Sequence, residues 1–121
     1  MAIGIGLLGL GTVGAGVAQI LQTPDGRHPL VKELELRQVA VRNLERARPV
    51  ELAAELLTTD PSAVVTNPAV DLVVEVMGGL EPARSLILAA IEAGKAVVTA
   101  NKAVIARHGA EIAAAAAAKG V

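Results

Sequence analysis

The residues best suited to chemistry are closely spaced glycines near the start of the chain. The pattern G-x-G-x-x-G occurs twice, as Gly4, Gly6 and Gly9 and again as Gly9, Gly11 and Gly14. We choose the second register because only three residues precede Gly4, too few for the strand that must lead into the turn. In this register Gly9 makes the tight turn, Gly11 lets the main chain approach a pyrophosphate, and Gly14 lets a helix pack closely on the strand.

An anionic group would lie at the start of the helix that follows this turn. The N–H groups of the first helical turn have no partner within the helix, and the helix dipole favours negative charge there. We expect Leu10, Thr12 and Val13 to line the ligand. Because any glycine-rich turn between a strand and a helix would fit so loose a pattern, the rest of the chain must support it.

Arg42 is the second candidate, at the end of a strand predicted over 34–41. In dinucleotide-binding units an acidic residue at this position commonly holds the ribose 2′-hydroxyl, whereas an arginine accommodates a 2′-phosphate. Arg42 therefore favours NADP, or the use of both NADP and NAD. The alternative is a solvated residue at a strand end, and a turn-rich loop at 23–29 makes the spacing to Arg42 longer than usual.

Two later strands, predicted over 71–77 and 95–100, also end in residues of interest. Gly78–Gly79 follows the first strand, at the same sheet edge as the glycine turn. Its main chain is expected to approach the cofactor near the crossover point, an ordinary loop being the alternative. Asn101 and Lys102 follow the second strand. Asn101 is placed to cap a helix, and Lys102 would project from the ligand-binding edge, although lysines there usually face solvent.

Strands and helices that position these residues alternate along the chain. Short apolar runs rich in β-branched residues predict strands, and apolar residues at helical spacing predict helices. The expected order after the first strand is helix 12–21, strand 34–41, helix 49–57, strand 57–59, helical turn 61–65, strand 71–77, a helix from 81 to a stop at Gly94, strand 95–100, and a helix through the alanine run to Gly120. The alternation predicts an α/β fold with a doubly wound, mostly parallel sheet. Glu75, alone in its apolar strand, is better explained by pairing than by catalysis.

Composition excludes several classes of function. Of 121 residues 53% are apolar and none is aromatic, so we expect one domain without stacking platforms for single-stranded nucleic acid. A net charge of −1 gives no basic footprint for nucleic acid or acidic membranes. The chain has no cysteine, and its two histidines are far apart in sequence, so no metal site is expected. We also expect no signal or membrane-spanning segment, and a cytoplasmic location.

Four segments together resemble the N-terminal part of homoserine dehydrogenases, and the last two are the most specific. They are 6–14 (GLLGLGTVG), 57–61 (LTTDP), 76–83 (VMGGLEPA) and 98–103 (VTANKA). The resemblance implies a Rossmann-type dinucleotide-binding domain over residues 1–121, with NADP or NAD as cofactor. It also implies the reversible interconversion of L-homoserine and L-aspartate 4-semialdehyde, in the pathway to threonine and methionine.

The resemblance also assigns roles to individual residues. Lys102 matches the family's lysine near the nicotinamide, which is implicated in cofactor binding and in proton transfer at the substrate oxygen. A cationic donor suits that position because hydride delivery to an aldehyde carbon leaves negative charge on oxygen. Arg42 matches the family's arginine beside the adenosine ribose. The remaining cofactor-binding residues are expected to be Met77, Gly78 and Gly79 in one motif and Thr99, Ala100 and Asn101 in the other.

The family's enzymes continue into a second α+β domain that carries the substrate pocket and much of the dimer interface. We find no counterpart of it in these residues, and the β-type Val121 after Gly120 suggests a pattern that continues. We therefore expect a fragment that binds the dinucleotide without turning over homoserine, and a homo-oligomer for the full-length protein. A regulatory nucleotide-sensing module is the alternative, although such modules usually carry an acidic residue at the position of Arg42. A third is an engineered fold without function, suggested by the alanine run and the missing aromatics.

Overall fold

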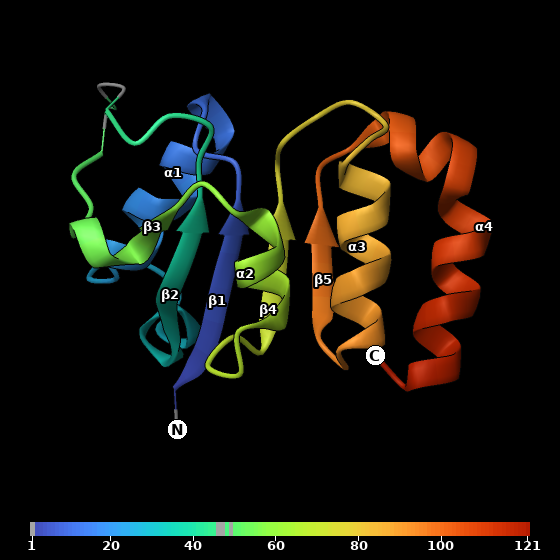
Figure 1. Cartoon of the computed structure of the whole chain (residues 1–121). Coiled ribbons are helices and arrows are strands. Elements are labelled where there is room, and N and C mark those ends of the chain that lie inside the picture. The colour runs from blue at the N-terminus through green and yellow to red at the C-terminus, as the bar shows by residue number, and fades with distance from the viewer. Residues whose placement is uncertain (1, 46–47, 49) are drawn as a thin grey trace.

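The protein is built from strands and helices that alternate along the chain (Figure 1). The computed structural model describes residues 2–45, 48 and 50–121. The elements are β1 (Ile3–Leu8), α1 (Thr12–Gln22), the 3-10 helix η1 (Pro29–Glu33), β2 (Leu34–Ala40), the 3-10 helix η2 (Ala54–Leu56), β3 (Leu57–Thr58), α2 (Pro61–Thr66), β4 (Leu72–Glu75), α3 (Ala83–Glu92), β5 (Ala96–Thr99) and α4 (Lys102–Lys119). None of the helices among these residues has the length and apolar character that crossing a membrane requires.

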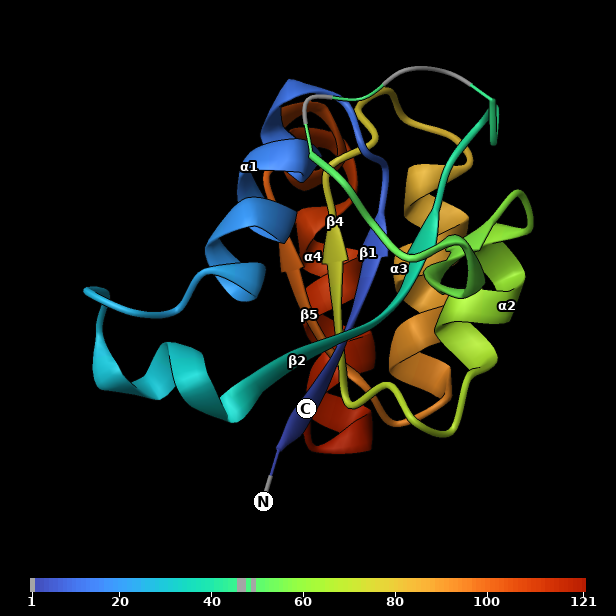
Figure 2. The same cartoon turned by 90° about the vertical axis from the view of Figure 1, so that its left-hand side faces the viewer.

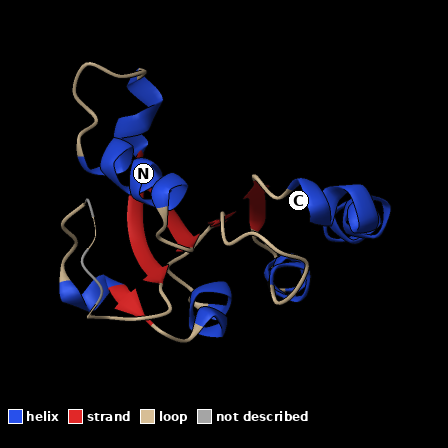
Figure 3. Cartoon of the chain, turned by 90° about the horizontal axis from the view of Figure 1, so that it is seen from above, coloured by secondary structure: helices blue, strands red, loops and turns tan. Residues whose placement is uncertain are grey.

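The strands form one sheet in the order β3-β2-β1-β4-β5, and every pairing is parallel. Figure 2 shows α1 on one face of this sheet and α2 and α3 on the other. Seen from above, the strands form a curved layer between the helices, with α4 at the β5 end beside α3 (Figure 3). These features confirm the predicted doubly wound sheet. The strand order reverses between β1 and β4, which is where such sheets form a crevice.

The core lies on both faces of the sheet because successive side chains of a strand point in opposite directions. In β1, Leu7 packs with Ala18 of α1, whereas the next residue, Leu8, packs in the cluster that contains Val64 of α2. Both leucines are fully buried. This two-sided burial explains why the central strands read as apolar runs without alternation.

Two glycines inside β1 have a structural role that the glycine pattern did not indicate. A Cβ atom at Gly4 would stand 1.9 Å from the carbonyl oxygen of Ala69, and one at Gly6 would stand 2.6 Å from Val64 Cγ1. The lack of side chains at Gly4 and Gly6 therefore lets α2 and the loop after it lie directly on the sheet. This contact accounts for the first G-x-G pair, and the chosen register is confirmed.

The predicted helix over 49–57 is wrong, with Pro49 lying outside the described residues. Residues 51–53 have no regular structure, and only the single turn of η2 follows them. Val50 and Leu52 instead pack against the buried cluster around Leu7. Alternate residues of an irregular segment reach the core here, so tertiary packing overrides the local helical spacing. The turn η1 was also not predicted.

The ends of the helices follow their sequence signals. Asp60 accepts the N–H of Ser62 at 3.0 Å at the start of α2, and Asn101 accepts the N–H of Val104 at 3.1 Å at the start of α4. Gly120 ends α4 in the left-handed conformation, with φ of 73°. Caps of this kind contribute about 1 kcal/mol each. The caps at Asp60 and Asn101 fix where the loops that follow β3 and β5 end.

Candidate functional site

The glycine turn joins β1 to α1 at the carboxyl edge of the sheet. Gly9 has φ of 101°, a conformation that side chains rarely adopt, and its N–H donates to Ala40 O at 3.1 Å. A Cβ at Gly14 would stand 2.2 Å from Gly9 O, so only glycine lets α1 approach the turn this closely. At Gly11 no atom lies within 4 Å of the Cβ position. The structure thus confirms the turn and the close helix packing, and it leaves open space beside Gly11.

The start of α1 is suited to an anion. No side chain caps this end, and the first turn carries no acidic residue. Thr12 and Val13 are exposed there. The N–H groups of the first turn, together with the helix dipole, form a site that favours a phosphate or a similar anion.

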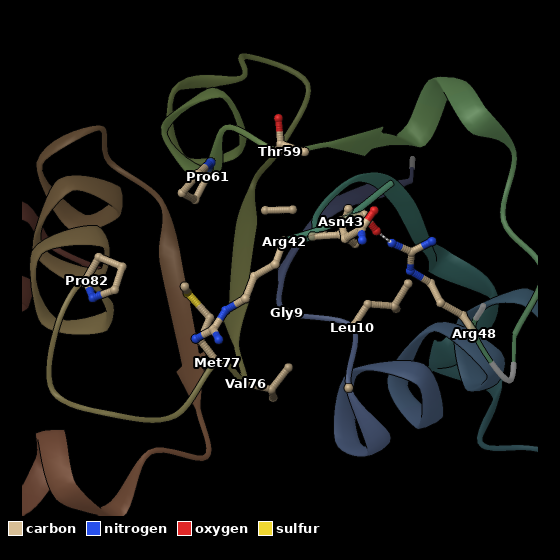
Figure 4. Close-up of a pocket in the computed structure, with 13 residues that line it drawn as sticks. Gly9, Leu10, Arg42, Asn43, Arg48, Thr59, Pro61, Val76, Met77 and Pro82 are labelled. Atoms are coloured by element: carbon tan, nitrogen blue, oxygen red, sulfur yellow. Dashed lines mark hydrogen bonds between the residues drawn. The ribbon is translucent and has the colours of Figure 1, made fainter. Parts of the chain in front are cut away.

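A pocket of about 490 Å³ lies beside this turn, between the ends of β2, β3 and β4 (Figure 4). Its lining residues are Gly9, Leu10, Gly11, Ala40, Val41, Arg42, Asn43, Arg48, Thr59, Pro61, Val76, Met77 and Pro82. Two of them are arginines, and no carboxylate is among these described lining residues. The pocket is therefore electropositive, as a phosphate-bearing ligand requires.

The two arginines of the pocket differ in what holds them. Arg42 is exposed and extends from the end of β2 into the pocket (Figure 4). Arg48 donates to the carbonyl oxygens of Asn43 and Leu44, so it closes the loop after β2 on itself. Arg42 makes no hydrogen bond or ion pair with any residue that the structure describes, which leaves its guanidinium available to a ligand.

A second group of residues lies at the neighbouring ends of β4 and β5. Glu75 is fully buried, and its carboxylate accepts the main-chain N–H of Met77 at 2.8 Å and of Gly78 at 3.3 Å. The hydroxyl of Thr99 donates to the other carboxylate oxygen at 2.5 Å. Asn101 Nδ2 donates to Gly79 O at 2.6 Å. The two loops that follow β4 and β5 are thus joined to each other by side-chain hydrogen bonds.

Lys102 is the first residue of α4 and is exposed. A positive charge at a helix N-terminus opposes the helix dipole and costs about 0.3–1 kcal/mol. Helix stability therefore gives no reason for a lysine at this position. Lys102 lies at the carboxyl edge of the sheet but not in the pocket beside Arg42.

The structure divides the predicted site residues into two groups. Those that line the pocket are Gly9, Leu10, Gly11, Arg42 and Met77. The others lie outside it at the same edge of the sheet: Thr12, Val13 and Gly14 in α1, and Gly78, Gly79, Thr99, Ala100, Asn101 and Lys102 at or beyond the ends of β4 and β5.

Sequence reasoning missed several residues of this edge. The pocket residues that it missed are Ala40, Val41, Asn43, Arg48, Thr59, Pro61, Val76 and Pro82. It also left Glu75 without a partner. The sequence does carry a signal for Thr59 and Pro61, because the strand expected over 57–59 ends there, and parallel strands end at one edge.

Four features together define a dinucleotide-binding α/β domain. They are the open parallel sheet, the glycine turn where the strand order reverses, the uncapped N-terminus of α1 and the electropositive pocket. A family model described as "Homoserine dehydrogenase, NAD binding domain" matches residues 9–121. The chain therefore belongs to this family of NAD-binding domains.

Individual relatives agree with this assignment. The chain is 62% identical over 112 residues to a homoserine dehydrogenase of Synechocystis sp.. The matched region covers 93% of this chain and 26% of that protein. It is 47% identical over 122 residues to the homoserine dehydrogenase of Corynebacterium glutamicum, and this match covers 99% of this chain and 27% of that protein. A solved homoserine dehydrogenase from Thiobacillus denitrificans matches with a TM-score of 0.86 and 49% identity, covering 100% of this chain and 28% of that one. The chain spans about a quarter of the length of the curated relatives it matches.

Proposed function

We propose that residues 1–121 are the cofactor domain of a homoserine dehydrogenase, which interconverts L-homoserine and L-aspartate 4-semialdehyde with NAD(P)H. The observation that carries the proposal is the open space at Gly11 between an uncapped helix start and an electropositive pocket. The family match and the relatives' identities of 62% and 47% support it. Since those relatives are about four times as long, the activity and the substrate belong to the proposal.

The cofactor's diphosphate would bind at the start of α1, against the main chain of Gly11. Its adenosine half would then occupy the pocket, with Arg42 beside the ribose. A guanidinium without a partner among the described residues binds a 2′-phosphate well. We therefore propose NADP as a ligand, with NAD as a weaker alternative that lacks this contact.

The nicotinamide half would pass over the ends of β4 and β5, because a dinucleotide spans the point where the strand order reverses. Residues Met77–Gly79 and Thr99–Lys102 would flank it. The bound cofactor supplies hydride transfer. Lys102 would hold the proton that neutralises the substrate oxygen, since its ammonium stands at the same sheet edge and is exposed.

The wider setting is also part of the proposal. A polypeptide of these 121 residues would bind the dinucleotide without oxidising homoserine. We propose a cytoplasmic location and a homo-oligomeric whole protein that binds neither nucleic acid nor membranes. The net charge of −1 and the absence of aromatic residues support the exclusion of nucleic acid.

The test is a pair of glycine-to-alanine substitutions, Gly11→Ala and Gly16→Ala. Both positions have no atom within 4 Å of the added Cβ, so neither change strains the fold. Only Gly11 faces the proposed diphosphate, and we expect its substitution to weaken NADPH binding by about tenfold or more. Because the chain has no Trp or Tyr, NADPH fluorescence reports binding without protein background.

Circular dichroism would verify that both variants fold. Alanine is a poorer N-cap than glycine, so Gly11→Ala should cost about 1 kcal/mol or less in stability. The proposal fails if the unmodified chain binds no NADPH, or if Gly11→Ala binds it as tightly as Gly16→Ala does.

A further inference from the structure

Glu75 is a fully buried carboxylate that the proposed chemistry does not use. Burying an ionised carboxylate is costly unless hydrogen bonds replace its water. Here three donors do so: the N–H groups of Met77 and Gly78 at one oxygen, and the Thr99 hydroxyl at the other. No cation pairs with it among the described residues. A buried carboxyl group bonded to three uncharged donors at a strand end suggests that its task is to hold those donors in place.

The hydrogen bonds continue from Glu75 through Thr99 and Asn101 back to the loop after β4. Thr99 donates its only hydroxyl proton to Glu75 and accepts the N–H of Asn101 at 3.0 Å. The Asn101 side chain donates to Gly79 O at 2.6 Å and accepts the N–H of Val104 at 3.1 Å. Two loops and the start of α4 are thereby joined in one network. In this network the side chains of Thr99 and Asn101 each donate one hydrogen bond and accept one.

This network lies next to the pocket that holds Arg42, on the side of β5, and the two meet at Met77. Glu75 and Thr99 do not line that pocket, and they pair directly in the register of β4 with β5. A dinucleotide that starts in the pocket and crosses Gly11 must next meet the loops that follow β4 and β5. The network therefore shapes the part of the edge that receives the second nucleotide half.

We propose that Glu75 and Thr99 are positioning residues for the nicotinamide half of the cofactor. They hold the main chain of 77–79 and of 99–102 in the form that receives this half, and neither of them lines the pocket proposed for the adenosine half. The inference rests on the proposed cofactor-binding function. It adds Glu75 to the residues of this half and gives Thr99 a positioning role, and the effect of both depends on which part of the ligand is present.

Three substitutions separate this role from a general contribution to stability. Thr99→Val keeps the shape of the side chain but removes both the donor to Glu75 and the acceptor for Asn101. Glu75→Gln keeps an oxygen for the two N–H groups but turns an N–H₂ group toward Thr99, so the hydroxyl proton loses its acceptor. Thr99→Ser keeps the hydroxyl and serves as the conservative control.

Each variant would be titrated with two probes, NADPH and 2′,5′-ADP, which carries only the adenosine half. We expect Glu75→Gln and Thr99→Val to bind NADPH about tenfold more weakly, while their affinity for 2′,5′-ADP changes by less than about twofold. Thr99→Ser should bind both probes as the unmodified chain does. A purely structural role would weaken both probes alike, and an unchanged ratio of the two affinities in folded variants would overturn the inference.

A measurement on the unmodified chain covers the case in which a variant does not fold. Amide hydrogen exchange of segments 78–79 and 99–102, which lie outside the adenosine pocket, should slow when NADPH is added but not when 2′,5′-ADP is added. Equal protection by both probes, or by neither despite binding, would refute the role of the network. If the unmodified chain binds neither probe, the proposed function itself fails, which is a different result from an unchanged affinity ratio.

Discussion

Replacing Gly14 with alanine tests the close contact between α1 and the glycine turn. The added Cβ would stand 2.2 Å from Gly9 O and 2.9 Å from Gly9 C. Even a weak contact between carbon and a carbonyl oxygen needs about 3.3 Å, so the gap is short by about 1.1 Å. Both partners are main-chain atoms, which cannot turn aside as a side chain can. We therefore expect α1 to move away from the sheet.

The cost can be bounded because α1 offers a matched control. Overpacking of a close contact costs about 1–3 kcal/mol, and main-chain atoms place Gly14→Ala at the upper end. Gly16 lies in the same helix with no atom within 4 Å of its Cβ position, so Gly16→Ala should gain about 0.5–1 kcal/mol from helix propensity alone. The propensity gain is common to both variants. The difference between their stabilities therefore equals the packing cost, about 1–3 kcal/mol.

Urea unfolding followed by circular dichroism would measure this difference, with NADPH titration in parallel. Gly14→Ala should unfold at lower urea and bind NADPH more weakly, since the displaced helix no longer presents its N–H groups beside Gly11. Equal stability of Gly14→Ala and Gly16→Ala would show that the helix does not depend on this contact. Close packing of α1 on the glycine turn would then contribute nothing to the stability of the fold.

Two further predictions concern residues away from the pocket. Lys95 is buried at the amino edge of the sheet and donates to two carbonyl oxygens after α2, at 2.7 and 2.6 Å; Lys95→Met should cost about 1–3 kcal/mol in urea unfolding and leave the Kd for NADPH unchanged. Hydrogen bonds from Arg84 hold the pKa of Glu111 below its usual value of 4.5, so Arg84 should stabilise the fold above about pH 4.5 and lose that effect as the pH falls through the lowered pKa. The urea midpoint of Arg84→Met should thus lie below that of the unmodified chain at pH 7 and converge with it toward pH 3, and a constant gap would contradict this origin.

The parts of the fold that sequence reasoning predicted correctly depend on signals that are local in the chain. The register of Gly9, Gly11 and Gly14 followed from the need for a preceding strand. Asp60 and Asn101 were recognised as helix caps because the cap residue and the N–H it accepts are two or three positions apart. Such short-range patterns fixed the element order and, with it, the edge at which the site must lie.

The parts that were missed depend on contacts between residues far apart. Val50 and Leu52 lie in a segment whose apolar residues have helical spacing. In the structure they pack against the cluster around Leu7, and the segment is irregular. The side-chain partner of Glu75 is Thr99, 24 residues later, and no spacing rule connects them. The role of Glu75 could be identified only once β4 and β5 were placed side by side.

The central strand β1, with glycines at positions 4 and 6, also influences the order in which the fold assembles. β1 is the first strand made, yet its Gly4 amide is held by Asp71, 67 residues further on, and β4 pairs along its other edge. Glycines lose much backbone freedom on folding and bring no side-chain packing of their own. We therefore expect this strand to stay open during synthesis until β4 emerges, and the sheet to close late and slowly for its size, because its contacts join distant parts of the chain.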